Sequence, residues 1–82
     1  MNIERYIFVF KKEEGDIVKE INVTFLNISI FENNFTAKSN DPNFYAPYKI
    51  EGEQYFELIK FIPELEFYPN SLFEYYIEAI SV

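Results

Sequence analysis

The run of residues 3–12 constrains the fold most, because its hydrophobic side chains occupy both alternating positions of a strand. Three aromatic residues would lie on one face and two aliphatic residues on the other, namely Tyr6, Phe8 and Phe10 against Ile7 and Val9. Apolar residues on both faces are typical of a strand at the centre of a sheet, or of one covered on both sides. The rest of the chain is therefore expected to be arranged around this strand.

A charged turn follows at residues 13–16, and its glycine can adopt the positive φ that tight turns need. Beyond this turn, apolar residues occupy odd positions over residues 21–25 and even positions over residues 26–30. A regular strand cannot change parity in this way without turning its core face to solvent. We therefore predict a β-hairpin whose second strand is long, residues 17–32, with a β-bulge or sharp bend near residues 25–27.

Two shorter extended segments are predicted next. The first is a strand at residues 35–39, and it is followed by a turn at residues 40–43, where Pro42 fixes φ and its Asn and Asp neighbours bond to their own backbone. The second covers residues 44–50. Pro47 within it lacks the amide hydrogen that a ladder needs, so this segment is expected at an edge of the sheet.

A helix is predicted over residues 51–62, where it would end before Pro63. Its apolar positions recur at helical spacing, at Tyr55, Leu58, Ile59 and Ile62. Residues 71–82 fit two patterns. A capping box at residues 71–74 and apolar residues at positions 73, 76, 77 and 80 favour a helix, whereas apolar residues at 75, 77 and 79 alternate as in a strand. We predict a helix there, with a further strand as the alternative.

These elements predict a single α+β domain over residues 1–82. It would contain a small antiparallel sheet of about four strands, including the long bent second strand, followed by one or two C-terminal helices packed on one face. Of the 82 residues, 49% are hydrophobic, which suffices for one modest core.

Missing residue types exclude several classes of chemistry. The chain has no Cys and no His, so it can form no disulfide, thiolate site or His-based catalytic pair. With two glycines it has no phosphate-binding glycine loop. No cofactor, metal or enzymatic activity is therefore expected. Glu53 and Glu57 share a helical face and could in principle serve as an acid–base pair or hold a cation, but a solvated surface is the better interpretation.

The net charge is −7, from 14 acidic and 7 basic residues. Affinity for nucleic acid depends on basic residues that release counterions, so nucleic acid is not an expected partner. The unbroken apolar runs are short, and residues 1–5 lead directly into a strand pattern rather than the apolar segment of a signal peptide. We expect a cytoplasmic protein that does not enter membranes.

Residues 51–82 hold seven Glu, a single Lys and no Asp or Arg, interleaved with eight aromatic residues. One or two short helices cannot bury all eight rings. Exposed aromatic rings among carboxylates favour a protein-binding surface, while a generous aromatic core with an acidic rim is the alternative. The residues expected to contact a partner are Glu53, Glu57, Glu64, Glu66, Tyr68, Glu74 and Glu78.

The function expected from these properties is binding to another protein that has a basic surface, with stoichiometric inhibition as the result. In size, charge and lack of catalytic residue types the chain resembles small acidic phage-encoded inhibitors of host defence and bacterial toxin-neutralising immunity proteins. That resemblance rests on no motif and implies no site residues.

Other functions remain open at this stage. The aromatic excess and the long second strand also fit a homo-oligomeric assembly subunit that pairs by strand addition. A protein that holds a small ligand between Tyr rings is less favoured, since an anionic nucleotide would need more basic residues. A hydrolase that uses carboxylates alone is favoured least.

Overall fold

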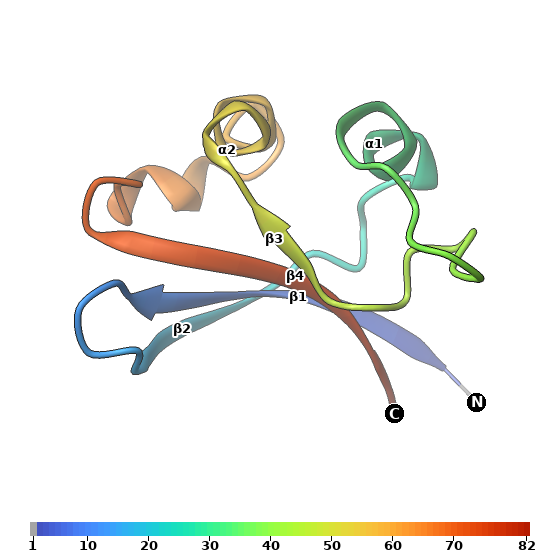
Figure 1. Cartoon of the computed structure of the whole chain (residues 1–82), viewed down its shortest axis with the longest axis horizontal. Coiled ribbons are helices and arrows are strands. Elements are labelled where there is room, and N and C mark those ends of the chain that lie inside the picture. Colours follow the sequence, from blue (N-terminus) through green and yellow to red (C-terminus); the bar gives the residue numbers. More distant parts are fainter. Residues whose placement is uncertain (1) are drawn as a thin grey trace.

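The computed structural model describes residues 2–82, which form a four-stranded antiparallel sheet with the helical segments on one face (Figure 1). In chain order the elements are β1 (Ile3–Lys11), β2 (Ile17–Asn22), α1 (Ile28–Asn34), β3 (Tyr48–Ile50), α2 (Gly52–Leu58), the 3-10 helix η1 (Pro63–Phe67) and β4 (Phe73–Ser81). The strand order is β2-β1-β4-β3. The predicted α+β class is therefore confirmed, but the helices lie between the strands in sequence instead of following them.

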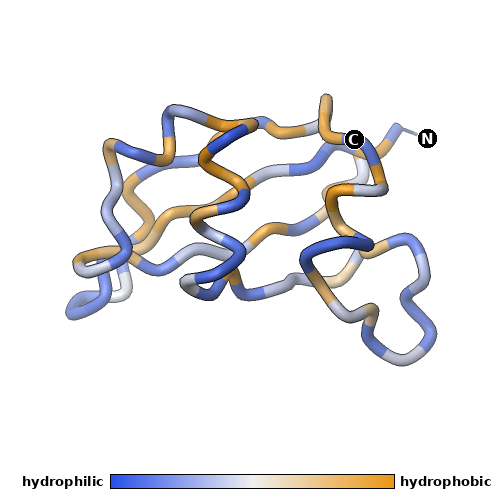
Figure 2. The backbone as a smooth tube through the Cα atoms, turned by 90° about the horizontal axis from the view of Figure 1, so that it is seen from above, coloured by the Kyte–Doolittle hydropathy of each residue, from blue (hydrophilic) through white to orange (hydrophobic). Residues whose placement is uncertain are grey.

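β1 lies between β2 and β4 and pairs with both, as the two-sided apolar pattern predicted. Its side chains Ile7 and Val9 are fully buried beneath the helices, and Ile7 is flanked by Ile21 of β2 and Ile77 of β4. The aromatic side chains of the opposite parity are half-buried on the other face: Tyr6, Phe8 and Phe10. Figure 1 draws no helix or strand of residues 2–82 below that face, so only one side of β1 is covered. Figure 2 shows hydrophobic stretches along the strands, with hydrophilic residues between them and in the turns and loops.

The predicted hairpin between β1 and β2 is confirmed. Gly15 has a φ of 74°, and its amide donates to the carbonyl of Lys11 at 2.8 Å. The amide of Lys11 in turn donates to the carbonyl of Asp16 at 2.9 Å, which closes the turn. The register of the two strands shifts between Val9 and Phe10, so the irregularity of this strand pair lies beside the turn.

The predicted long second strand is wrong beyond Asn22, and so is the bend near residues 25–27. The amide of Thr24 donates to the Asn22 side chain at 2.9 Å and thereby starts a turn. The Asn27 side chain then accepts from the amide of Ser29 at 2.9 Å and caps the first turn of α1. The chain leaves the sheet where two Asn side chains offer the backbone a local alternative to strand pairing.

The shift of the apolar residues from odd to even positions, which suggested a bulge, is explained by a turn and a helix instead. Val23, Leu26 and Phe31 are buried, and Ile30 is half-buried against the same core. Val23 and Leu26 lie in the turn before α1, and Ile30 and Phe31 lie within it, so these positions do not have to follow the period of two of a strand. β-branched residues in this segment favoured a strand locally, but packing of this apolar set over the sheet decides the outcome.

Residues 35–47 form an irregular connection to β3, so the predicted strand at 35–39 is wrong and the turn at residues 40–43 is confirmed. Phe44 has a φ of 56°, which is strained for a bulky side chain. Arg5 holds this conformation, because its Nη1 donates to the carbonyl of Phe44 at 2.6 Å and its Nη2 to that of Asn43 at 2.8 Å. The guanidinium also lies 4.6 Å from the ring centroid of Phe31. The single Arg of the chain thus joins β1, α1 and this connection.

Asp41 organises the second half of the same connection. Its carboxylate accepts hydrogen bonds from the amides of Tyr45 at 2.8 Å and Ala46 at 3.1 Å and from the hydroxyl of Tyr48 at 2.7 Å. The Tyr48 hydroxyl, together with these amides and the nearby charge of Lys38, holds the pKa of Asp41 below its usual value. The loop is therefore tied to the first residue of β3 by a charged acceptor.

The extended segment predicted at residues 44–50 is a strand only over its last three residues, β3, and its place at the edge of the sheet agrees with the prediction from Pro47. The helix predicted at residues 51–62 is α2 with a continuation of irregular turns, since the α-helix itself ends at Leu58. Its start is marked by the amide of Glu51, which donates to the side chain of Gln54 at 2.7 Å. The predicted inner stripe is correct, with Tyr55, Leu58 and Ile62 buried and Ile59 half-buried. η1 then begins at Pro63.

The helix predicted at residues 71–82 is wrong, and its alternative, a strand, is correct. β4 pairs with all nine residues of β1 and also with β3. Tyr75 and Ile77 are 1% exposed and face the helices, whereas Tyr76 and Glu78 face the other side of the sheet. A helix would have placed Tyr76 and Ile77 on the same apolar stripe, but pairing with a distant strand outweighs that local pattern.

Replacing Arg5 by Met should lower the free energy of unfolding by about 1–3 kcal/mol, because two charge-assisted hydrogen bonds to loop carbonyls are lost. Urea unfolding followed by circular dichroism measures this change. Lys12→Met removes the same charge from an exposed site and is the matched control. Equal losses in the two variants would show that Arg5 acts only through the net charge.

The lowered pKa of Asp41 predicts a pH-dependent contribution to stability. The ionised carboxylate is favoured in the folded state, so its contribution is complete above the unfolded-state pKa of about 4 and is lost as the pH falls through the lower folded-state value. The difference in unfolding free energy between wild type and Asp41→Asn should therefore shrink as the pH falls from 6 to 3. The control is Asp16→Asn in the exposed hairpin turn. The prediction would be contradicted if the difference in unfolding free energy between wild type and Asp41→Asn stayed constant from pH 6 to pH 3.

Candidate interaction surface

The helical layer between β3 and β4 carries the surface richest in exposed aromatic rings. Its inward side chains, Tyr55, Leu58, Ile62 and Leu65, are buried against the sheet. Ile59 also packs against the core, whereas most of the other side chains of α2, the following turn and η1 are exposed. We call the outward set the aromatic–acidic ridge, and it consists of Phe56, Phe61 and Phe67 with Glu53, Glu57, Glu64 and Glu66.

The three rings of the ridge are exposed to an unusual degree for phenylalanine. Phe56 is 62% exposed, Phe61 46% and Phe67 79%. Isolated exposed apolar residues are common on protein surfaces, but three Phe rings within twelve residues form a concentrated set. Their exposed area contributes little to folding, so it is free to be buried against another molecule.

The four carboxylates of the ridge are only partly paired. Glu57 lies 3.1 Å from Lys60, and Glu64 lies 3.3 Å from Lys19 of β2. Glu53 and Glu66 have no ion-pair partner within residues 2–82. Exposed pairs of this kind contribute about 0–1 kcal/mol, so they exchange readily for a cation on a partner. The ridge therefore presents a net negative charge around its rings.

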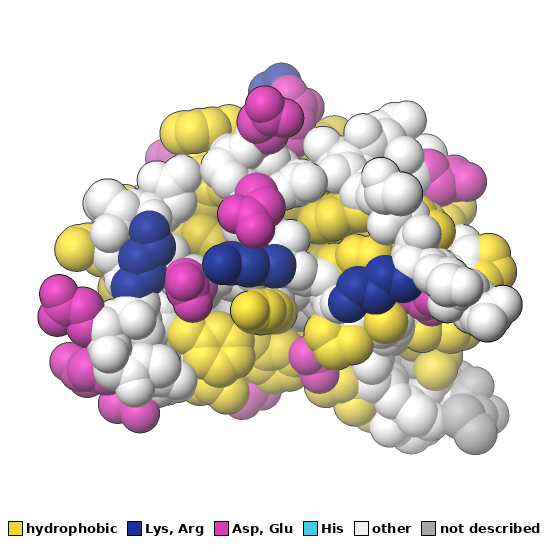
Figure 3. Space-filling view, viewed as in Figure 1, with side chains coloured by type: hydrophobic (Ala, Val, Ile, Leu, Met, Phe, Trp, Pro, Cys, Tyr) yellow, Lys and Arg dark blue, Asp and Glu magenta, His cyan; other side chains and the backbone are white. Residues whose placement is uncertain are grey.

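A hollow of about 460 Å³ lies beside the ridge, between the end of α1 and α2. Its lining residues come from these two helices: Asn33, Asn34, Glu53, Gln54, Phe56 and Glu57. The Gln54 side chain donates to the carbonyl of Asn34 at 3.0 Å and so fixes the separation of the two helices. One exposed ring with a carboxylate on either side is suited to hold a Lys or Arg side chain of a partner. Figure 3 shows acidic side chains over α2 with hydrophobic ones beside them.

Two buried tyrosines fix the position of η1 and hence of the ridge. The Tyr55 hydroxyl donates to the carbonyls of Leu65 at 2.9 Å and of Tyr68 at 3.2 Å. The Tyr75 hydroxyl donates to the same Tyr68 carbonyl, and the Tyr55 and Tyr75 rings stack with centroids 5.0 Å apart. Burial raises the pKa of Tyr75 well above its usual value, so its hydroxyl stays a donor. The ridge is consequently attached to β4 by a rigid, hydrogen-bonded contact.

The seven residues expected to contact a partner do not form one surface. Glu53, Glu57, Glu64, Glu66 and Tyr68 lie in the helical layer, while Glu74 and Glu78 lie on the opposite face of the sheet. The division follows from the wrong helix at residues 71–82, because a strand directs alternate side chains away from the helices. Tyr68 is half-buried against the core, and its ring contacts Phe73 edge to face at 5.5 Å. Its backbone carbonyl, not its ring, is the part that organises the ridge.

Sequence reasoning missed the aromatic residues on the uncovered face of the sheet. They are Tyr6, Phe8, Phe10 and Tyr76, and all four are half-buried. The signal was present in the first strand, whose two apolar faces require either two covering layers or one exposed apolar face.

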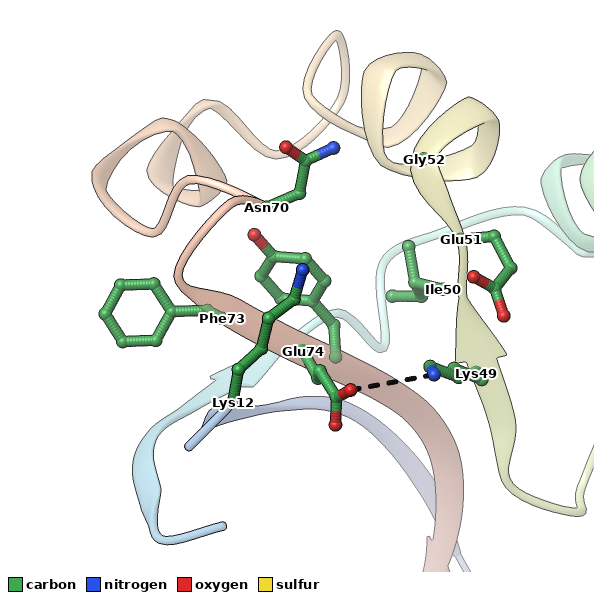
Figure 4. A pocket seen from close by; sticks show the side chains of 9 residues that line it. Lys12, Lys49, Ile50, Glu51, Gly52, Asn70, Phe73 and Glu74 are labelled. Atoms are coloured by element: carbon green, nitrogen blue, oxygen red, sulfur yellow. Dashed lines mark ion pairs between the residues drawn. The ribbon is translucent and has the colours of Figure 1, made fainter. Parts of the chain in front are cut away.

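Figure 4 shows a smaller hollow of about 190 Å³ where β3 passes into α2 and β4 begins. Lys12 and Lys49 face Glu51 and Glu74 across it, and the Nζ of Lys49 lies 3.7 Å from Oε1 of Glu74. Charges of both signs balance there, and the volume is below the several hundred Å³ typical of small-molecule pockets. This hollow gives the small-ligand hypothesis no support.

The chain belongs to the family described as domain of unknown function DUF7683, whose model matches residues 4–78. No curated protein and no solved structure matches it. Within residues 2–82, neither α-helix has the length or the apolar character needed to cross a membrane.

Replacing Tyr55 by Phe should lower the free energy of unfolding by about 1–2 kcal/mol, because two hydrogen bonds that hold η1 are lost in a buried site. Amide hydrogen exchange in residues 64–68 should become faster at the same time. Tyr45→Phe, at an exposed ring, is the control. Unchanged exchange in residues 64–68 would show that packing alone holds η1.

Proposed function

We propose that this protein is a non-catalytic binding module whose aromatic–acidic ridge occupies a basic surface of another protein and blocks it stoichiometrically. The observation that carries the proposal is the set of three exposed Phe rings placed between four carboxylates on a rigid frame. Full burial of a Phe side chain contributes about 1.5–3 kcal/mol, so partial burial of three rings supplies useful affinity. The net charge of −7 would speed the encounter with a basic partner.

The rings and the carboxylates have different parts in this proposal. Phe56, Phe61 and Phe67 act as the apolar anchors that dominate interface energetics. Glu53 and Glu57 flank the hollow beside Phe56 and receive a Lys or Arg side chain from the partner. A surface that only replaces the phosphates of a nucleic acid would present carboxylates without rings, so the rings favour an ordinary protein interface over nucleic-acid mimicry.

The proposed class of function is that of small acidic inhibitors, such as phage anti-defence proteins or bacterial immunity proteins. Size, charge and residue types support this class. We place the activity in the cytoplasm, which the lack of Cys supports because small secreted domains usually rely on disulfides. Homo-oligomerisation through the free edge of β2 is the second candidate, since Ile17 is 52% and Val18 38% exposed there.

Capture of partners from a host lysate tests the proposal when three forms of the protein are compared. The ridge variant carries Phe56→Ser, Phe67→Ser, Glu53→Lys and Glu66→Lys, and the control carries Phe25→Ser, Glu13→Lys and Glu32→Lys at exposed positions elsewhere. Circular dichroism first establishes that both remain folded. Wild type and control should retain one stoichiometric partner with a basic surface, with less retained as salt rises, and the ridge variant should lose it.

Equal retention by the ridge variant would remove the ridge from the interface. Retention that does not change with salt would argue against a basic partner surface. If nothing is captured and sedimentation shows a dimer, the free edge of β2 becomes the favoured interface.

A further inference from the structure

The face of the sheet turned away from the helices carries a second organised set of side chains. Sheets with one face in water usually place polar residues there. Here the centre of that face is aromatic, and acidic residues border it. We call this set the open sheet face, and it consists of Tyr6, Phe8 and Phe10 of β1, Tyr76 and the acids Glu74 and Glu78 of β4, and Glu20 of β2.

The strand register places these residues side by side. Phe8 lies opposite Tyr76 on β4 and opposite Glu20 on β2. On either side of this central row, Tyr6 lies opposite Glu78 and Phe10 lies opposite Glu74. The result is an aromatic strip along β1 with a carboxylate on the strand to one side and two carboxylates on the strand to the other.

The rings of the strip pack on one another and not on the core. The Tyr6 and Phe8 centroids are 6.1 Å apart, and Phe10 meets Tyr76 edge to face at 5.8 Å. All four rings are half-buried, and none belongs to the hydrophobic core cluster or packs against it. The core is therefore complete without them. Figure 3 shows hydrophobic side chains gathered below the level of the strands, with acidic ones at their borders.

The dimensions of the open sheet face fit one α-helix. A strand rises by about 3.4 Å per residue, so the strip from Tyr6 to Phe10 is roughly 14 Å long. Neighbouring strands are about 4.8 Å apart, which places the acids of β2 and β4 on lines roughly 10 Å apart. An α-helix with its side chains is about 10–12 Å wide. A helix lying along β1 would rest on the rings and have carboxylates along both of its sides.

Charge decides what kind of molecule can cover this face. The face carries Glu20, Glu74 and Glu78, and two cations, Lys12 and Lys49, line the hollow beside Glu74, where Lys49 lies 3.7 Å from it. A fourth carboxylate, Glu4, accepts a hydrogen bond from the Tyr6 hydroxyl at 2.7 Å at one end of the strip. A second copy of this chain would bring like charges together, and its net charge of −7 would add to the repulsion. A partner must therefore be basic as well as apolar.

We propose that the open sheet face binds a basic amphipathic helix of a partner protein. The apolar stripe of that helix rests on Tyr6, Phe8, Phe10 and Tyr76, and Lys or Arg residues that flank the stripe reach Glu20 on one side and Glu78 on the other. Because this face and the aromatic–acidic ridge lie on opposite sides of the sheet, the two can be occupied together. The proposal does not depend on the function assigned to the ridge.

Titration of the whole protein with synthetic helical peptides tests the proposal. One peptide of about 18 residues, long enough for a helix to form on binding, carries a Leu stripe flanked by Lys. The second replaces the Leu stripe by Ser, and the third keeps Leu but replaces Lys by Glu. Affinity is measured by calorimetry, and the site is mapped by backbone amide chemical shifts.

The Leu–Lys peptide should bind at least about tenfold more tightly than either of the others, because both burial and charge pairing are needed. Amide shifts should concentrate in β1, β4 and β2. Glu20→Lys with Glu78→Lys should weaken binding by at least about tenfold, and Glu53→Lys with Glu66→Lys on the ridge should leave it unchanged. Each pair of substitutions changes the net charge by the same amount, one pair on the open sheet face and the other on the ridge. The comparison therefore shows which of the two surfaces binds the peptide.

Three results would overturn the proposal. Equal binding of the Leu–Lys and Ser–Lys peptides would reduce it to non-specific charge attraction, and equal binding of the Leu–Glu peptide would reduce it to non-specific apolar contact. Shifts confined to α2 and η1, or loss of binding in the ridge pair alone, would move the site to the ridge. A dimer in sedimentation whose interface protects the open sheet face would assign that face to a second copy.

Discussion

Pairing between β1 and β4 determines the arrangement of the whole chain. All nine residues of β1 face all nine residues of β4, so segments from the two ends of the sequence form the centre of the sheet. Everything between them must then cross one face or occupy an edge. β2 takes one edge through a tight hairpin, and β3 takes the other as a three-residue strand. The helices between these strands cover the single face that their short connections reach.

This pairing also divides the aromatic residues into two groups. Tyr75 and Ile77 of β4 point under the helices, where Tyr75 stacks on Tyr55 of α2. Their neighbour Tyr76 points the other way and meets Phe10. The core needs only the side chains that face the helices, and no polar or charged residue of the described chain is buried with them. The aromatic excess of the sequence is thus explained by two surfaces outside the core, the ridge and the open sheet face.

The local sequence pattern predicted correctly those elements for which it is compatible with only one structure. The hairpin at Gly15, the edge position after Pro47 and the inner stripe of α2 each follow from a residue whose backbone or spacing allows little choice. The sequence of residues 71–82 is compatible with both a helix and a strand. Pairing with β1, more than sixty residues away in sequence, stabilises the strand. The prediction for residues 23–34 failed for a related reason, since a turn started by Asn22, a cap at Asn27 and a short helix together imitate the apolar pattern of an irregular strand.

The same distinction applies to the candidate sites. The acids of α2 and η1 lie in the same helical layer, which their closeness in sequence predicts. Glu74 and Glu78 were assigned to the same group through the wrong helix, and the strand moves them to the far side of the sheet. Their neighbours on β1 are Phe10 for Glu74 and Tyr6 for Glu78, which are far away in sequence, so no local pattern could have joined them.

Two acidic surfaces on one small sheet have consequences for recognition. The field of a molecule with a net charge of −7 attracts a basic partner to either side, so charge alone cannot decide which surface it occupies. The shape of the aromatic set supplies that choice. The ridge has separate rings and a hollow beside Phe56, which suits the proposed partner with a projecting cation. The open sheet face is a strip one strand wide with carboxylates along both sides, and it fits a rod.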